Sequence, residues 1–311
     1  MLAATAVAVL AGAASVIVAV IRPGSAPASH SAAPSGTASL GAGAQFADAD
    51  AVSAFMAAGA SDITAVTTYD YRRLDDALSS GLAVTTGAYR SAYRQAMTGT
   101  LATSARSAHV VHQFQVMEIG IGGISANGRQ AKVLVFGRQV TTDRTSAAGG
   151  DVALVTLCAT MQRQGDDYLI SNLAQDASAG LPPGSTDLAT AAQAARAEVG
   201  NLLTYRRSQF GADLARTLAG ATGPLRSQLQ HDAAATRTAM TRGKYDLGGA
   251  ITALAVKSAD GTSATFLLAA DARKISASGA TIGSTAMRYV VTVVKSSGTW
   301  VAAQIDTLTS G

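Results

Sequence analysis

Three aspartates, Asp70, Asp75 and Asp76, lie within one short tyrosine-rich segment and are the best candidates for acid–base chemistry in this 311-residue chain. A carboxylate in an apolar pocket can transfer protons, as it does in isomerases and dehydratases. Here Arg72 and Arg73 lie beside all three carboxylates. Local ion pairs, or capping of a helix start, explain the same spacing more simply, so we predict no catalytic residue.

Four tyrosines flank these acids and offer a second kind of chemistry. Tyr69, Tyr71, Tyr89 and Tyr93 could line a cavity for a hydrophobic ligand. Aromatic side chains at helical spacing more often belong to a hydrophobic core, and we favour that interpretation.

The histidines and the cysteine do not form a recognisable metal or nucleophile pattern. The histidines are His30, His109, His112 and His231. We expect His109 and His112 on one strand, where a spacing of three places them on opposite faces. No cysteine or paired acid lies at ligand spacing, so we predict no metal site and no cofactor. The single cysteine, Cys158, excludes an intrachain disulfide and lies in an apolar run typical of a buried, inert thiol.

The elements that must position these residues occur twice in the sequence. Tyr69, Gly87 and Arg90 recur as Tyr205, Gly223 and Arg226, each 136 positions later. Farther on the offset falls to 133, between Gly128 and Gly261, and then to 132, between Tyr168 and Trp300. A repeat this long indicates a duplicated domain rather than a solenoid.

The N-terminal segment predicts a membrane anchor. Residues 2–21 are uncharged and rich in Ala, Val, Leu and Ile, and twenty such residues can cross the roughly 30 Å hydrocarbon layer once. The alternative is a secretory signal cleaved after Ala28. Residues 22–45 are rich in Ser, Ala, Gly and Pro and predict a flexible linker.

Charge is divided unevenly between the two copies. Residues 47–176 carry 10 Lys or Arg and 12 Asp or Glu, whereas residues 187–311 carry 13 and 8. The second copy is therefore mildly basic, which suits anionic lipid or an acidic partner, although an ordinary solvated surface has the same composition. The basic residues are dispersed without aromatic interleaving, so we expect no nucleic-acid binding.

The first copy, predicted over residues 46–178, begins with helices and ends with strands. An apolar stripe through Val52, Phe55 and Ile63 predicts the first helix, and further helical patterns pass through Leu74 and Tyr89. Four strands are expected at 110–124, 130–140, 152–163 and 168–174. The first of them contains Gly120, Gly122 and Gly123, where a bulge or a close backbone approach is expected.

The second copy, predicted over residues 187–311, repeats this order. Its helices carry Val199 and Phe210, and its strands are expected at 245–257, 262–272, 286–295 and 300–308. The segment from Leu181 to Ser185 contains Pro-Pro-Gly and marks the boundary. Helices followed by an antiparallel meander predict an α+β fold of two tandem cones, each with helices packed on its own bent four-stranded sheet. A single continuous sheet would argue against separate domains.

These motifs resemble the Mce-associated membrane proteins of actinobacteria, which accompany mammalian-cell-entry lipid-transport complexes. The resemblance implies a cystatin-like or nuclear-transport-factor-like cone behind a single membrane span. The second copy keeps Tyr205, Gly223 and Arg226 but lacks the Asp, Tyr, Arg, Leu and Asp motif that the first copy has at positions 70–75. In the first copy the matching residues are Tyr69, Asp70, Tyr71, Arg72, Leu74, Asp75, Thr86, Gly87, Tyr89, Arg90, Tyr93 and Val133 to Phe136.

Three classes of function follow. The resemblance implies a non-enzymatic accessory or scaffold protein of an Mce-type complex, anchored in the plasma membrane with both cones outside the cytoplasm. The alternatives are a scaffold subunit of a conjugation or type IV secretion-like channel, and a small-ligand binder or isomerase that uses a cone mouth. We further expect the two copies to have different roles. The first should make the specific partner contact, through the surface near its first helix junction, around residues 70–76. The second should make a weaker electrostatic contact with anionic lipid or an acidic partner.

Overall fold

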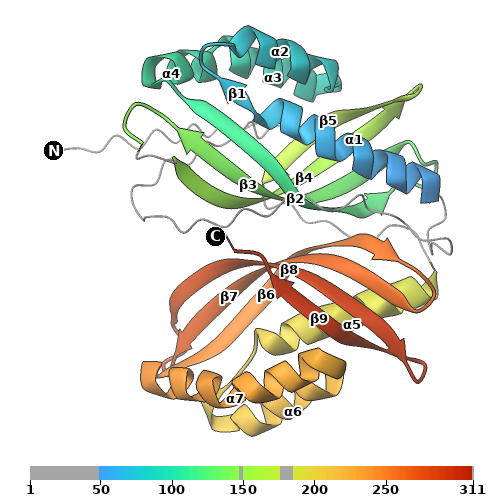
Figure 1. Cartoon of the computed structure of the whole chain (residues 1–311), viewed down its shortest axis with the longest axis vertical. Coiled ribbons are helices and arrows are strands. Elements are labelled where there is room, and N and C mark those ends of the chain that lie inside the picture. The colour runs from blue at the N-terminus through green and yellow to red at the C-terminus, as the bar shows by residue number, and fades with distance from the viewer. Residues whose placement is uncertain (1–48, 147–149, 176–184, 310–311) are drawn as a thin grey trace.

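A computed structural model of the chain describes residues 49–146, 150–175 and 185–309. The predicted anchor (2–21) and linker (22–45) lie outside the described residues. Within those ranges no helix combines the length and the apolar character needed to cross a membrane. The described part is an α+β structure, as the sequence predicts, and it has one large antiparallel sheet (Figure 1).

The first copy consists of a long helix, three short helices and four long strands. Val52, Phe55 and Ile63 on the first helix are fully buried against the sheet, which explains the apolar stripe. A two-residue strand, β1, is an addition that the sequence did not predict. The elements are α1 (Ala49–Thr67), β1 (Tyr69–Asp70), α2 (Leu74–Ala83), α3 (Gly87–Thr98), α4 (Thr100–Ala108), β2 (Val111–Ile124), β3 (Gln130–Thr142), β4 (Asp151–Gln164) and β5 (Asp167–Gln175).

The second copy repeats this order with fewer helices. Its elements are α5 (Thr186–Leu202), the 3-10 helix η1 (Arg207–Gln209), α6 (Phe210–Gly220), α7 (Gly223–Gly243), β6 (Tyr245–Ala259), β7 (Ser263–Ser276), β8 (Thr281–Ser296) and β9 (Thr299–Thr307). In Figure 1, α1 and α5 each lie along their own strands, and the remaining helices cover the two opposite ends of the molecule. The two blocks of strands face each other between them.

One helical segment differs between the copies because of a glycine. In the first copy, Gly99 adopts φ −111° and ψ −120° and separates α3 from α4. A Cβ there would lie 2.8 Å from the carbonyl oxygen of Gln95. The second copy has one continuous helix, α7, in the same place. Both segments end on a left-handed residue, His109 (φ 56°) and Lys244 (φ 53°).

The strands form one connected sheet in the order β5-β4-β3-β2-β6-β7-β8-β9, with β1 paired to β2. The link between the copies is a single antiparallel residue pair, Ile121 with Val256. The prediction of two separate sheets is therefore wrong, because this pair merges them into one sheet, although each copy keeps a block of four consecutive long strands. A Cβ on Gly120 would meet the Val256 carbonyl oxygen at 3.0 Å and the Ala255 Cβ at 3.1 Å. The missing side chain thus permits the close approach that the glycines predicted.

The two linked positions are equivalent in the repeat. Ile121 pairs with Val133 inside the first copy, and Val256 pairs with Phe266 inside the second, where Val133 and Phe266 are 133 positions apart. The irregularities in the ladders recur as well, at Ile121/Gly123 and at Val256/Ser258. Equivalent positions that meet each other are the mark of an isologous, twofold-related interface. The duplicated halves are therefore arranged like the subunits of a symmetric dimer.

Candidate functional site

The predicted acidic segment contains an exposed ion pair. The carboxylate of Asp70 accepts hydrogen bonds from the backbone N–H and the guanidinium of Arg72, with Nη2 to Oδ2 at 2.7 Å. These hydrogen bonds lower the pKa of Asp70. Asp75 and Asp76 are exposed in the first turn of α2, where a negative charge suits the helix dipole. The expected local pairing is confirmed for Asp70.

The tyrosines mainly occupy the core of the first copy. Tyr69, Tyr89 and Tyr93 are buried, and Tyr71 is half-buried. The hydroxyl of Tyr93 donates a hydrogen bond to the carbonyl of Ala77, at 3.0 Å. Burial raises the pKa of Tyr69 and of Tyr93 to about 12. The core interpretation is thus confirmed for three of the four rings.

The two histidines that were expected on one strand lie on different elements, which corrects that prediction. His109 follows α4 as its left-handed cap, and its ring stacks on Tyr71 at 4.6 Å. His112 begins the buried part of β2, stacks on Tyr69 and hydrogen-bonds the Thr67 carbonyl through Nδ1. Burial lowers the pKa of His112, so its ring is neutral near pH 7. The sequence failed here because α4 contains few large apolar residues and resembles a loop.

Two buried carboxylates were not predicted as site residues. Asp62 on α1 is 8% exposed and Glu198 on α5 is 0% exposed. The two are 136 positions apart, so they are equivalent in the repeat. Burial raises the pKa of Asp62 to about 6 and that of Glu198 to about 7. A signal was present in the sequence, since an acid interrupts the apolar stripe of the first helix at the same place in both copies.

Glu198 is enclosed by the neighbouring helices. Its Oε2 accepts a hydrogen bond from the amide of Asn201 at 3.4 Å, and its Oε1 has no partner among the described residues. A Cβ on Gly220, at the end of α6, would lie 2.1 Å from Oε2. Perturbed carboxylates often mark active sites. Here the close packing of α6 leaves this carboxylate no exposed surface for a substrate.

A second buried acid of the same copy is ionised and paired with two arginines. Asp213 on α6 is completely buried and accepts hydrogen bonds from Arg206 (2.7 Å) and Arg216 (2.8 Å). These hydrogen bonds, led by that of Arg206, hold the pKa of Asp213 far below its usual range. Arg216 also donates to Asn201, which connects this cluster to Glu198. The cluster joins α5, the following loop and α6, so its evident role is structural.

A smaller apolar cluster lies between the two blocks of strands and contains residues of both copies. Alternate residues of β3 face opposite ways, with Val133 and Val135 in the main core and Leu134 and Phe136 in this junction, as the period of two along a strand requires. Cys158, which is buried, belongs to the junction, as expected for an inert thiol. From the second copy the junction contains Ala253, Ala255, Leu267, Ala269 and Val290.

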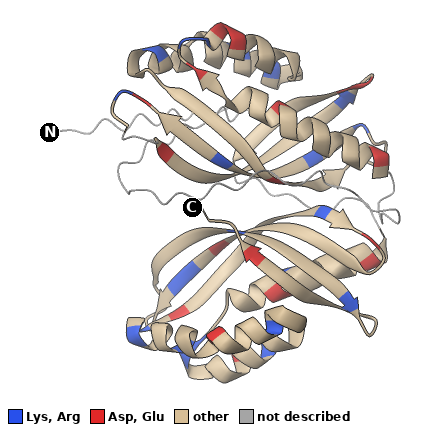
Figure 2. Ribbon diagram, in the orientation of Figure 1, with Lys and Arg blue, Asp and Glu red and all other residues tan. Residues whose placement is uncertain are grey.

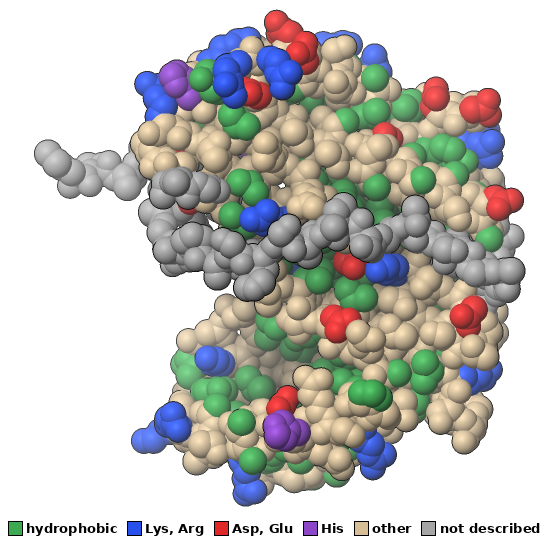
Figure 3. All heavy atoms as spheres, viewed as in Figure 1, with side chains coloured by type: hydrophobic (Ala, Val, Ile, Leu, Met, Phe, Trp, Pro, Cys, Tyr) green, Lys and Arg blue, Asp and Glu red, His purple; other side chains and the backbone are tan. Residues whose placement is uncertain are grey.

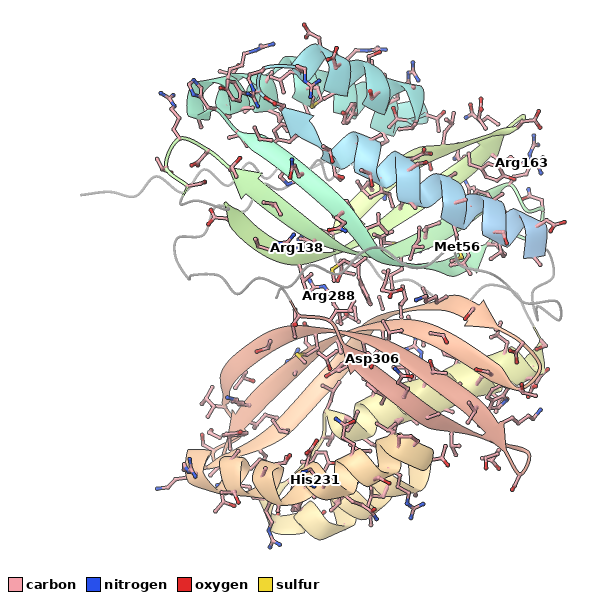
Figure 4. The ribbon with its side chains drawn as sticks, viewed as in Figure 1. Met56, Arg138, Arg163, His231, Arg288 and Asp306 are labelled. Atoms are coloured by element: carbon pink, nitrogen blue, oxygen red, sulfur yellow. The ribbon has the colours of Figure 1, made fainter. Side chains whose placement is uncertain are left out.

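Polar contacts fix the register of the junction. The Nε of Arg288 donates a hydrogen bond to the Thr156 hydroxyl at 2.9 Å, and both side chains are buried. These two residues are 132 positions apart and therefore also equivalent. Lys257 and Glu118 form an ion pair of 2.7 Å across the same junction. Figure 4 shows Arg288 between the two blocks of strands.

No metal-binding cluster of three or more His, Cys, Asp or Glu side chains occurs in the part of the chain that the structure describes. An open polar cleft lies beside the β2–β3 turn. Its lining consists of Ser125, Asn127, Arg129, Gln130, Gln162 and Arg163.

Residues 185–308 match the model of a family described as uncharacterized protein Rv1363c/MT1408-like, which is mycobacterial. This match spans α5 to β9, the second copy of the repeat. No curated protein sequence matches the chain.

Among solved structures, the chain is similar to an "Ntf2 like protein involved in plasmid conjugation", with 9% identity, a TM-score of 0.26, and coverage of 82% of this chain and 96% of that one. It is also similar to the intermembrane space region of the chloroplast protein ARC6, with 12% identity, a TM-score of 0.26, and coverage of 40% and 91%.

Proposed function

We propose that this protein is a non-enzymatic scaffold at the cell envelope, anchored by residues 2–21, with two cystatin-like cones that stabilise an Mce-type lipid-transport complex. The observation that carries the proposal is the junction in which Thr156 meets Arg288 and Ile121 meets Val256. A well-packed apolar interface holds both copies in one orientation, so their outer helices are presented at opposite ends of one body.

The polar groups of the cones support a scaffold over an enzyme. Asp70 is paired with Arg72, and Asp213 is paired with two arginines. Glu198, the carboxylate with the most suitable pKa for proton transfer, is 0% exposed and packed against Gly220. A general base must come within about 3 Å of the proton that it removes. A substrate could reach Glu198 only if α5 and α6 separated.

The specific partner contact is assigned to the first copy, at the surface around the first helix junction. Asp75, Asp76 and Arg73 are exposed there, within the segment 69–76 whose motif resembles the Mce-associated proteins. The second copy lacks these residues, so the same partner surface is not repeated.

The proposal is tested by cross-linking cells that carry the tagged full-length protein, followed by purification and quantitative mass spectrometry. We expect recovery of permease and substrate-binding subunits of an Mce-type transporter. The double variant Asp75→Arg and Asp76→Arg should lose them, whereas the matched variant Asp166→Arg and Asp167→Arg, at the β4–β5 turn, should retain them. Recovery of a coupling ATPase and a relaxase instead would establish the alternative, a scaffold subunit of a conjugation or type IV secretion-like channel.

A further inference from the structure

The excess positive charge of the second copy is concentrated at one end of the molecule. The end is formed by the last turns of α7, the end of β7 and the start of β8, because Tyr245 at the start of β6 pairs with Ser276 of β7. Figure 2 shows basic residues at this end, on α7 and β7. We call this surface the cationic end; its five exposed cations are Arg237, Arg242, Lys244, Arg273 and Lys274.

The nearest acids do not neutralise these five cations. Asp246 is bound by Arg207, Nε to Oδ1 at 3.0 Å, which lowers its pKa. Asp271 is half-buried, two residues inward of Arg273 on β7, and Asp232 lies farther back along α7. Figure 3 shows basic side chains spaced along this edge of the molecule.

Aromatic rings hold two of the cations in place. The Nζ of Lys274 lies 5.0 Å from the ring centroid of Tyr245, and the guanidinium of Arg237 lies 5.9 Å from that of Phe210. Such contacts orient a cation without removing its charge. The charges are therefore held at the surface rather than folded back onto carboxylates.

An exposed apolar residue protrudes from the same end. Ile282 is 57% exposed, more than any other large hydrophobic residue that the structure describes. The ladder shifts between Lys274, which pairs with Gly283, and Ile275, which pairs with Thr281, so Ile282 is the extra residue of a β-bulge. Bulges commonly re-aim a side chain. Here the bulge turns Ile282 outward beside the cations.

We propose that the cationic end docks on an anionic phospholipid surface, with Ile282 inserted among the headgroups. Each Lys or Arg near such a surface contributes about 1 kcal/mol, and a buried apolar side chain adds to this attraction. A stable protein partner would need roughly 1,000 Å² of complementary surface. One protruding isoleucine beside a group of exposed cations suits a lipid surface better. The inference rests on the proposed envelope role and adds a second point of membrane contact.

The test uses the full chain with an environment-sensitive fluorophore on Ile282→Cys. Cys158 is buried and is replaced by Ala so that only one thiol reacts. The probe is read with phosphatidylcholine vesicles and with vesicles that contain an increasing fraction of phosphatidylglycerol. We expect about a twofold rise in fluorescence that requires the anionic lipid and is lost in high salt. Because the probe reports its own surroundings, insertion of residues 2–21 does not produce this signal.

Matched controls separate docking from general attraction. Lys244→Gln should raise the concentration of anionic vesicles needed for half of the fluorescence rise about fivefold, the change in affinity that corresponds to about 1 kcal/mol. Arg196→Gln changes a residue that is exposed on α5 of the same copy, and it should leave this vesicle concentration unchanged. The same probe on Met117→Cys, which is exposed on β2, should not respond.

Three results would overturn the inference: a silent probe at position 282, an equal response at position 117, or a response to soluble polyglutamate but not to vesicles. The last would identify an acidic polypeptide as the partner. None of these results alters the recovery of transporter subunits, so failure of lipid docking is distinguishable from failure of the proposed scaffold role.

Discussion

At the scale of single residues, Glu198 makes stability depend on pH. Its folded pKa of about 7 lies above its usual value, so the folded state binds the proton more tightly than the unfolded chain. The contribution of the protonated Glu198 carboxyl to the free energy of unfolding is therefore fully present below about pH 4.5. It is lost as the pH rises through 7. We expect Glu198→Gln to raise the free energy of unfolding by about 3 kcal/mol at pH 8 and to have little effect near pH 4.5.

Urea unfolding at several pH values measures this effect. Asp62→Asn, the equivalent change in the first copy, should act in the same direction but less strongly, because its pKa is raised only to about 6. Parallel stability curves for Glu198→Gln and the unaltered protein between pH 4.5 and 8 would show that the Glu198 carboxyl is not held protonated.

Asp213 should have the opposite pH dependence. Its pKa is lowered by Arg206 and Arg216, so its contribution is present at neutral pH and is lost as the pH falls below about 4. Asp213→Asn should reduce the free energy of unfolding at pH 7 by about 1–2 kcal/mol, since both arginines are partly exposed. Asp70→Asn, which alters an exposed pair, should have little effect. Equal destabilisation by both changes, measured by thermal unfolding, would contradict this assignment.

At the scale of elements, the strand junction depends on Gly120. A larger side chain there must displace Val256 or Ala255, so Gly120→Val should destabilise the protein by about 1–3 kcal/mol and increase amide exchange at the centre of β6. Gly123→Val is the matched control on the same strand, because no atom lies within 4 Å of its added Cβ. Hydrogen exchange with mass spectrometry compares the two variants. Equal exchange in both would mean that Gly120 is not the contact point.

The strands could be read from the sequence, but their connection could not. Val133 and Leu134 of β3 lie on opposite faces, as the period of two along a strand requires. Most strand ends were predicted to within three residues, but β7 extends to Ser276 and β8 begins at Thr281, beyond the predicted ends at 272 and 286. The single pair between Ile121 and Val256 carries no local pattern, because it joins positions far apart in the chain. The helix α4 was missed for a related reason, since Gly99 interrupts the helical pattern and alanines supply most of its buried contacts.

The candidate site was only partly predictable. The exposed pair of Asp70 and Arg72 followed from their spacing, because both belong to one turn. The burial of Glu198 depends on Gly220 of α6, a packing contact that no local pattern encodes. The repeat nevertheless indicated that these carboxylates are buried, since Asp62 and Glu198 interrupt the apolar stripes of the two first helices at equivalent positions.

At the scale of the whole molecule, the account depends on the two copies acting as one rigid body. The outer helices of the copies lie at opposite ends of the molecule in Figure 1, so a fixed junction sets the distance between them. Loss of that rigidity would leave two tethered cones and would remove the basis of the scaffold proposal.

The most direct measurement is the distance between spin labels on Ser79→Cys in α2 and Ala235→Cys in α7, both exposed, in the full chain with Cys158 replaced by Ala. Double electron–electron resonance should give one narrow distance distribution, and Gly120→Val should broaden it. Gly123→Val should leave it narrow. A broad or multimodal distribution in the otherwise unaltered chain would show that the copies move independently and would contradict the account.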